Sequence, residues 1–401
     1  MFASLRAAGL ALLIALGLAA AARAAPPLTV LISFDGFRAD YLDLGVTPTL
    51  SNLAARGARA AMRPSFPTKT YPNHYALVTG LRPDRNGIVE NTILDPTNPD
   101  ATFTMSDNAA ITDAHWWSQA TPIWVTAERA GIHTAPMFWP GSEAEIMGVR
   151  PTHWLPFVMA MTPTQRTDQI LAWLDEPAET RVRFATLYFD DVDTAGHHFG
   201  PGSPEVKAAA AKVDAAVARL TDGLKAMGIE ANLIIVADHG MAATSPDRRI
   251  FYDDLFQPAA ARVITAGAYL SLYPAAGHQA EVAAALLKPH AHMQCWRKQD
   301  IPPRYHYGAN PRVPPLFCLP RTGWEITTHA FKGHDLGNHG FDPYSPQMAA
   351  VFIASGPAFR AGVTLRSFDN VDVYALLARL IGVKPVAGDG RLAHVAAALK
   401  P

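Results

Sequence analysis

The chain has few cysteines and almost no net charge, and each of these features argues against a class of protein. Its 401 residues include two cysteines, Cys295 and Cys318, which are too few to form a cysteine-based zinc site. The formal net charge is −1 and the sequence pI is about 7.0. This balance argues against a protein that holds nucleic acid through a basic surface field. It remains compatible with a local positive site made by metal ions.

Long hydrophobic runs are also scarce, and the clearest one lies at the N-terminus. Arg6 precedes an apolar run that ends at the small-x-small motif Ala22-Arg23-Ala24. The pattern predicts a signal peptide over residues 1–24, with a retained N-terminal anchor as the alternative. Residues 25–401 are then expected to be exported to the periplasm or secreted, with no stable membrane span after cleavage. The sequence does not indicate an oligomeric state.

The state of the two cysteines depends on this predicted export. An oxidising compartment makes a disulfide chemically possible. Spacing along the chain does not show whether the two residues meet, so a Cys295–Cys318 bridge and a pair of buried free thiols both remain open.

Hydrophobic residues make up 49% of the chain, enough for a large core, and three apolar runs end in acidic residues. The runs at 28–34, 182–189 and 232–237 have the length and composition of buried parallel strands. Helical patterns lie between them. The alternation predicts an α/β fold with a doubly wound, mostly parallel central sheet and helices on both faces. Because ligands bind at the carboxyl ends of such strands, the acids there are candidate site residues.

Three segments depart from this alternation. Residues 92–119 lack a clear periodicity, which favours an excursion over the surface. Residues 144–162 contain several prolines and aromatic residues and are interpreted as a loop near a pocket mouth. Residues 250–335 mix short strand-like runs, a helix and a proline-rich stretch, so we expect a small subdomain inserted in the catalytic domain 25–401.

A threonine between two prolines is the candidate nucleophile. Thr70 lies between Pro67 and Pro72 and just before an apolar run, which predicts a tight turn that leads into a helix N-terminus. The free N–H groups and the dipole at such an end favour negative charge. Thr70 is thus well placed to attack a phosphoryl group if something activates its hydroxyl. The alternative is a helix cap, and neighbouring Lys69 either contacts phosphate or only covers apolar surface.

Aspartate and histidine residues at four places offer that activation. They are Asp35, Asp193 with His197, Asp238 with His239, and His339. Asp193 and His197 stand at i and i+4, so a helical turn would place them on one face. The adjacent Asp238 and His239 either face two different ions or reach the same one, and their spacing does not decide between these. Taken alone, each residue is also consistent with a helix cap or a satisfied core residue.

Together these residue types indicate a two-metal centre for phosphoryl transfer. Carboxylate oxygen and imidazole nitrogen suit Zn²⁺. Two ions about 3.5–4 Å apart can hold the attacking and leaving oxygens of an in-line displacement. The side chain of Asn91 could donate to a phosphoryl oxygen as charge develops there.

Seven motifs in order make the chain resemble the nucleotide pyrophosphatase/phosphodiesterase family of the alkaline phosphatase superfamily. The resemblance covers most of the mature chain. The motifs are Phe34-Asp35-Gly36, Pro67-Thr68-Lys69-Thr70-Tyr71-Pro72-Asn73-His74, Gly87-Ile88-Val89-Glu90-Asn91, Phe138-Trp139-Pro140-Gly141-Ser142, Asp193-x-x-Gly196-His197, Ala237-Asp238-His239-Gly240-Met241 and His339-Gly340-Phe341-Asp342.

The resemblance implies two zinc ions and assigns a ligand set to each. One set is Asp193, His197 and His339, and the other is Asp35, Thr70, Asp238 and His239. Thr70 matches the nucleophile that forms a covalent phosphothreonine-type intermediate, and Asn91 matches the residue that binds a non-bridging phosphate oxygen. Nearby His74 is interpreted as a supporting residue.

The resemblance also implies a nucleoside site lined by aromatic residues. Tyr71 and Tyr188 resemble residues that flank the nucleoside, and Phe157 lies near the position of a base-stacking aromatic. From the residues alone, such side chains are more often part of the core.

We therefore predict an exported zinc phosphodiesterase and nucleotide pyrophosphatase that releases nucleoside monophosphate. One alternative keeps the two-zinc site but acts on choline or glycerol phosphodiesters, or on monoesters, with Trp154 and Phe157 caging a quaternary ammonium group. The other is a periplasmic zinc-binding protein without activity, which would need neither Thr70 nor Asn91.

Overall fold

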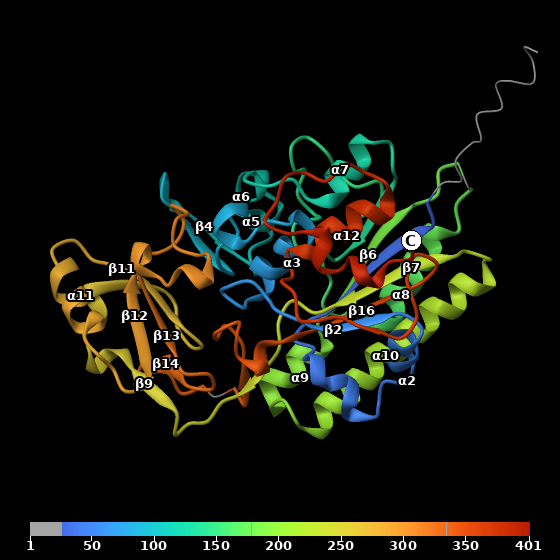
Figure 1. Ribbon diagram of the computed structural model, residues 1–401. Coiled ribbons are helices and arrows are strands. Elements are labelled where there is room, and N and C mark those ends of the chain that lie inside the picture. The colour runs from blue at the N-terminus through green and yellow to red at the C-terminus, as the bar shows by residue number, and fades with distance from the viewer. Residues whose placement is uncertain (1–25, 178, 334) are drawn as a thin grey trace, which may run out of the picture.

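The computed structural model describes residues 26–177, 179–333 and 335–401 (Figure 1). The predicted signal peptide, residues 1–24, lies outside the described residues. In the described parts of the chain, no helix combines the length and the apolar character needed to cross a membrane.

The core of the molecule is a seven-stranded sheet in the order β17-β2-β16-β7-β1-β6-β5. Strand β1 pairs in parallel with β6 and β7, and β5 pairs in parallel with β6. Strand β16 runs antiparallel to both of its neighbours. The strands are β1 Leu28–Phe34, β2 Ala58–Met62, β5 Thr134–Met137, β6 Phe184–Phe189, β7 Ala231–Val236, β16 Ala350–Ser355 and β17 Val363–Thr364. Because β1 and β6 are buried along their whole length, their sequences are nearly continuous apolar runs.

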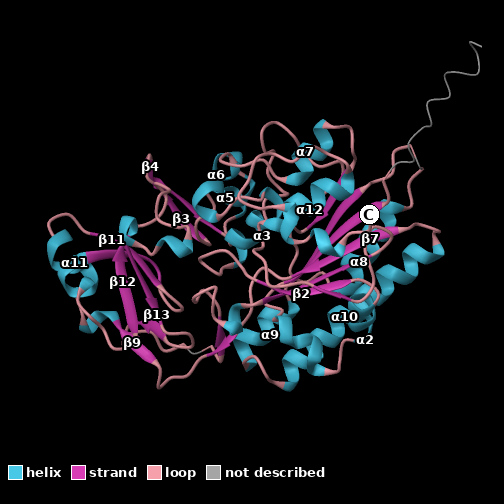
Figure 2. Ribbon diagram, in the orientation of Figure 1, coloured by secondary structure: helices cyan, strands magenta, loops and turns pink. Residues whose placement is uncertain are grey.

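Helices cover both faces of this sheet, as the alternating pattern predicted (Figures 1 and 2). One layer packs around the long helix α10 and consists of α2 Pro48–Ala55, α8 Pro163–Leu174, α9 Asp191–Phe199 and α10 Pro204–Ala226. The opposite layer consists of α3 Thr70–Thr79, α7 Ile123–Arg129 and α12 Asp372–Ile381. The α/β class and the mostly parallel central sheet are confirmed.

Residues 92–119, predicted as an excursion over the surface, contain regular elements that the sequence pattern did not indicate. They form a hairpin of β3 Thr92–Asp95 and β4 Asn98–Thr104, followed by α5 Asn108–Thr112 and α6 Ala114–Trp117. Asp107 and Asp113 cap these helices by accepting backbone N–H groups. Helices this short complete barely one turn, so they show no 3.6-residue period. Phe103 and Trp117 are fully buried in the main core rather than on the surface.

Residues in the 250–335 range form a second, smaller sheet, on the left of Figure 1. Its antiparallel strands follow the order β10-β11-β13-β12. They are β10 Ala261–Thr265, β11 Leu270–Pro274, β12 Met293–Arg297 and β13 Leu316–Pro320. Helix α11 (Gln279–Leu287) packs beside β12, and a hydrophobic cluster separate from the main core fills this unit. Cys295 and Cys318 face each other across β12 and β13 and form a disulfide, which settles the alternative of free thiols.

Candidate active site

Three carboxylates meet at the carboxyl edge of the central sheet. Asp35 directly follows β1, Asp238 lies just beyond β7, and Asp193 lies in the first turn of α9 behind β6. The turn at Gly36 lets them approach, because its φ of 69° suits glycine and a Cβ there would lie 3.0 Å from Asp193. The N–H of Gly36 donates to Asp238 Oδ1 at 3.2 Å.

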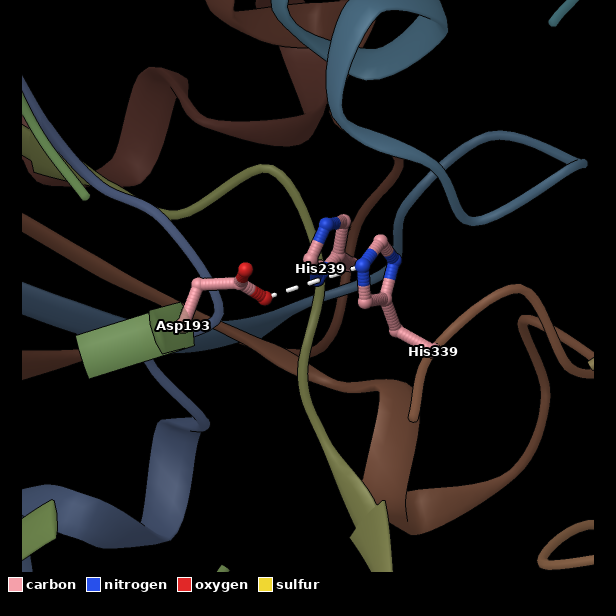
Figure 3. Close-up of side chains that lie close together, drawn as sticks. All are labelled: Asp193, His239 and His339. Carbon is pink, nitrogen blue, oxygen red and sulfur yellow. Dashed lines mark ion pairs between the residues drawn. The ribbon is translucent and has the colours of Figure 1, made fainter. Parts of the chain in front are cut away.

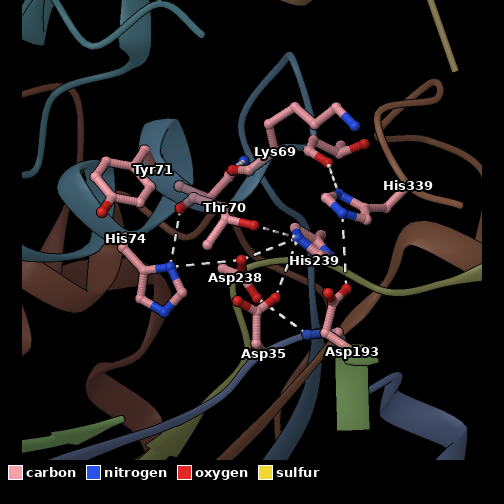
Figure 4. A network of polar contacts seen from close by, with 12 residues as sticks. Asp35, Lys69, Thr70, Tyr71, His74, Asp193, Asp238, His239 and His339 are labelled. Atoms are coloured by element: carbon pink, nitrogen blue, oxygen red, sulfur yellow. Dashed lines mark hydrogen bonds and ion pairs between the residues drawn. The ribbon is translucent and has the colours of Figure 1, made fainter. Parts of the chain in front are cut away.

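Three histidines close around these carboxylates, and Figure 4 shows two of them, His239 and His339. His239 Nε2 lies 3.0 Å from Asp238 Oδ2 and 3.4 Å from Asp35 Oδ1. His339 Nε2 lies 3.6 Å from Asp193 Oδ1, and Figure 3 shows its ring against that of His239. His197 Nε2 lies 3.4 Å from Asp193 Oδ2. Both residues are on α9, so the i,i+4 spacing does place them on one helix face.

The backbone holds each of these imidazoles in one orientation. The Nδ1 atoms of His197, His239 and His339 lie within 3.0 Å of the carbonyl oxygens of Gly337, Gly240 and Thr68, respectively. Because a carbonyl oxygen can only accept, each Nδ1 carries the proton and donates it. The Nε2 atoms are left as lone-pair donors directed at the carboxylates, which is the usual arrangement of metal-binding histidines.

The carboxylates also carry buried oxygens without hydrogen-bond partners. These atoms are Asp35 Oδ1, Asp193 Oδ1 and Asp238 Oδ2. A buried carboxylate oxygen without a donor is costly unless a cation meets it. The residues present therefore fit divalent metal ions. Two clusters with ligand atoms close enough to share an ion stand out among the described residues, Asp193-His239-His339 and Asp35-His74-Asp238.

The electrostatics of the cluster favour the binding of cations. Burial, followed by repulsion from neighbouring carboxylates, raises the pKa of both Asp35 and Asp238 well above the usual range. Burial lowers the pKa of His239 and His339, so both imidazoles are neutral and able to ligate. Bound divalent cations would favour the charged carboxylates and relieve their repulsion.

The ring of His74 is held in place beside the cluster. Its Nδ1 donates to the carbonyl oxygen of Thr70 at 2.8 Å, and its Nε2 accepts from the hydroxyl of Ser33 at 2.9 Å. Burial lowers its pKa to about 3. With both ring nitrogens engaged, His74 ties the first turn of α3 to β1.

Thr70 lies where the turn meets α3, next to the Asp/His cluster. It is the first residue of the helix, and Lys69 occupies the cap position, so Thr70 is not the cap. Its side chain is buried, and its Oγ1 lies 3.4 Å from His239 Nε2. The structure therefore brings Thr70 together with ligands from distant segments.

A pocket of about 430 Å³ opens beside Thr70 and contains the predicted aromatic residues. Tyr71, Phe157 and Tyr188 line it together with Asp35 and Asp193. Tyr188 also donates its hydroxyl to Asp35 Oδ2 at 2.6 Å. Asn91 is not part of the pocket lining. Its Oδ1 accepts the N–H of Tyr71 at 3.0 Å, which leaves its amide hydrogens as the donors it can offer a ligand.

Sequence reasoning missed part of this pocket. Phe138, Trp139 and Glu143 line it as well. Phe138 and Trp139 belong to the motif 138–142, which was recognised but received no role, and Glu143 directly follows it. The available signal was its position directly after a strand, at the same edge of the sheet as the acids.

A protein-family model described as type I phosphodiesterase / nucleotide pyrophosphatase matches residues 29–342. The chain belongs to this family. As a phosphodiesterase/nucleotide pyrophosphatase, it is a hydrolytic enzyme, a phosphoric diester hydrolase. The ligand clusters and the pocket described above all fall within the matched residues.

Similar proteins from several organisms agree with this family assignment. A Schizosaccharomyces pombe protein described as an uncharacterized pyrophosphatase/phosphodiesterase is 37% identical over 385 residues, covering 90% of this chain and 78% of the relative. Human ectonucleotide pyrophosphatase/phosphodiesterase family member 5 is 34% identical, covering 91% and 76%. A bis(5'-adenosyl)-triphosphatase from Xenopus laevis is 34% identical, covering 92% and 80%.

Solved structures show the same fold. Murine ectonucleotide pyrophosphatase/phosphodiesterase 5 superposes with a TM-score of 0.89 at 34% identity, covering 93% of this chain and 100% of that chain. A second structure of the murine phosphodiesterase is a threonine-to-alanine variant, described as inactive, in complex with AMP.

Proposed function

We propose that this phosphodiesterase is an exported, zinc-dependent enzyme that cleaves phosphodiester or pyrophosphate bonds of nucleotides through a covalent intermediate on Thr70. The observation that carries the proposal is the position of Thr70 Oγ1, between the buried Asp/His cluster and a pocket walled by aromatic residues. A zinc-binding protein without activity would need no hydroxyl in that position. The murine relative supports the proposal, since its inactive variant lacks a threonine and binds AMP.

Two zinc ions would be held by residues of this cluster. In the proposed assignment, one ion is bound by Asp193, His197 and His339, and the other by Asp35, Thr70, Asp238 and His239. The position of His239 Nε2 near Asp35, Asp238 and Thr70 supports its place in the second set. When bound, the two ions supply positive charge for the attacking and leaving oxygens.

Side chains of this protein supply the nucleophile, a donor to the phosphate and the contacts with the nucleoside. Thr70 Oγ1 forms a bond to phosphorus while the bond to the leaving oxygen breaks, and water later cleaves the Thr70 ester and releases nucleoside monophosphate. The Asn91 amide donates to a non-bridging oxygen. Tyr71, Phe157 and Tyr188 hold the nucleoside by stacking and apolar contact.

The choline-cage alternative finds less support in the pocket. Trp154 does not line it, and its ring already carries the guanidinium of Arg150 at 4.9 Å. A substrate panel on the zinc-loaded enzyme tests the choice. We expect a nucleotide nitrophenyl ester to be hydrolysed at least tenfold more efficiently than choline or glycerol phosphodiesters. A preference for the choline or glycerol esters would overturn the nucleotide assignment.

We also propose how the chain is divided and where it acts. Residues 1–24 are a signal peptide, 25–401 form the catalytic domain, and 250–335 form the inserted unit. The Cys295–Cys318 disulfide supports an oxidising destination, periplasmic or secreted. N-terminal sequencing of the exported protein tests the cleavage site, since a start near Ala25 is expected and an intact N-terminus would contradict it.

A further inference from the structure

One charged side chain is almost completely buried behind the wall of the pocket. Arg166, on α8, is 1% exposed and is among the largest fully buried residues described. It does not line the 430 Å³ pocket and has no place in the mechanism above. A buried guanidinium is costly unless its donors and its charge are matched, so its partners indicate what it does.

Arg166 makes directional contacts with the strand end that borders the pocket. Its Nη1 lies 2.7 Å from Asp190 Oδ1 and donates to the carbonyl oxygen of Tyr188 at 2.9 Å. Its Nε donates to the carbonyl oxygen of Met161 at 2.8 Å. The planar group thus fixes the end of β6 relative to the loop that precedes α8.

Arg166 also contacts two aromatic rings of the pocket wall. The guanidinium carbon lies 5.2 Å from the ring centre of Phe138 and 5.5 Å from that of Phe157, within the range of cation–π contacts. These rings also meet each other, with centroids 5.2 Å apart. Phe138, Phe157, Tyr188 and Asp190 all line the pocket, so a single side chain behind the wall joins four of its residues.

Phe157 depends on such support more than its neighbours do. It is 37% exposed and lies in the segment 144–162, which contains neither a helix nor a strand. No strand ladder or helical turn therefore fixes its ring. Besides the contacts with Phe138 and Arg166, its N–H donates to Glu143 Oε1 at 3.3 Å, and its ring lies 6.2 Å from that of Tyr188.

We propose that Arg166 is a positioning residue that holds the nucleoside-binding wall and thereby sets the preference for nucleotides over phosphodiesters without a nucleoside. This inference rests on the proposed function of the pocket. Arg166 acts through Phe157 and the Tyr188 segment rather than by touching substrate, because its charge is buried and matched by Asp190. Arg166 meets Tyr188 at its backbone carbonyl oxygen, whereas the contact of Tyr188 with the Asp/His cluster is made by its hydroxyl, on Asp35.

The test compares two substrates in the zinc-loaded Arg166→Lys variant. Lysine keeps the charge but cannot reproduce the planar set of donors and ring contacts. We expect KM for a nucleotide nitrophenyl ester to rise about tenfold with kcat little changed. Both constants for bis(4-nitrophenyl) phosphate, which carries no nucleoside, should stay within about twofold. Arg219→Lys is the matched control, because Arg219 of α10 pairs with the exposed Asp168 of α8. This variant should leave the kinetic constants for both substrates unchanged.

A second measurement keeps the proposal testable if turnover is too low to measure. In a Thr70→Ala background, Arg166→Lys should weaken AMP binding about tenfold and leave binding of inorganic phosphate unchanged. An equal loss of kcat/KM for both substrates, or of affinity for both ligands, would show a merely structural role and overturn the proposal. Unchanged kinetic constants and affinities would overturn it as well. If the wild-type enzyme itself shows no preference for the nucleotide ester, the proposed function fails instead.

Discussion

The imidazole rings of His239 and His339 lie face to face, with centroids 3.5 Å apart and 13° between their planes. They come from loops far apart in the sequence, and each donates its Nδ1 proton to a backbone carbonyl. Two charged imidazolium rings would repel each other at this distance. The burial that lowers the pKa of both therefore also allows them to stack. Their Nδ1 hydrogen bonds direct the two neutral Nε2 atoms at the carboxylates.

Removal of metal should abolish activity and lower stability. Without cations, the pKa values of the buried Asp35 and Asp238 carboxyls are raised, so their charged forms are strained by burial and mutual repulsion. We expect a chelator to remove more than about 99% of activity and to lower Tm by several degrees, since ligands that bind the folded state stabilise it. Added Zn²⁺ should restore both, as measured by a nitrophenyl ester assay and thermal unfolding. Full activity in protein shown to be metal-free would contradict the two-metal centre.

Tyr188 should affect metal binding as well as the pocket. Its hydroxyl donates to Asp35 Oδ2 at 2.6 Å, so Tyr188→Phe keeps the ring but removes a group that orients a ligand. We expect zinc affinity to fall about tenfold or more, because partners that orient metal ligands typically have this effect. Competition with a chromophoric chelator measures it. Tyr307→Phe is the control, since that hydroxyl donates to the carbonyl oxygen of Val89 at 3.1 Å and contacts no ligand. Equal zinc affinity in the wild type and in Tyr188→Phe would disprove the role.

The pKa of Glu90 predicts a pH-dependent stability. Glu90 is fully buried and accepts a hydrogen bond from Thr265 in the inserted unit, and burial raises its pKa from 4.5 to about 7. Because the folded-state pKa is the higher one, the stabilisation is complete below about pH 4.5 and is lost as pH rises through about 7. The loss is about 3 kcal/mol.

A neutral side chain at this position should remove that loss. Relative to the wild type, the free energy of unfolding of Glu90→Gln should increase as pH rises from about 4.5 to 7, measured by urea unfolding. Glu205→Gln, at an exposed helix start, should show no such trend. A constant difference between Glu90→Gln and the wild type across this range would show that the carboxyl titrates normally.

The disulfide should stabilise the inserted unit without contributing to catalysis. It closes a loop with a sequence separation of 23, for which the chain-entropy relation gives about 3 kcal/mol. Replacing both Cys295 and Cys318 with alanine should lower the urea midpoint, while zinc content and kcat stay within about twofold of the wild type. A large loss of zinc in the folded variant would instead couple the inserted unit to the metal centre.

Much of the site was predictable because its residues stand at the ends of recognisable strands. The apolar run at 28–34 indicated a buried strand, and Asp35 after it indicated the edge where ligands bind. The i,i+4 spacing of Asp193 and His197 predicted a shared helix face, and α9 has it. Proline positions around Thr70 predicted the start of α3.

Long-range contacts explain what the sequence could not predict. The adjacency of Asp238 and His239 left their directions open, and only the fold places His239 Nε2 between Asp35 and Asp238. In the hairpin over 92–104, tertiary packing buries Ile93, Leu94 and Phe103, which the weak periodicity of the segment does not reveal. The contacts of Arg166 join segments that are separate in the sequence, and no local pattern marks its burial on α8.

The most direct test of the central claim is to acid-quench the zinc-loaded enzyme during turnover of a nucleotide ester and locate the covalent adduct by mass spectrometry. We predict a nucleotidyl group on Thr70. We also predict that Thr70→Ala forms no adduct and loses turnover by at least about a thousandfold, yet binds zinc and folds normally. An adduct on another residue, or a Thr70→Ala variant that still turns over at the wild-type rate, would contradict the account.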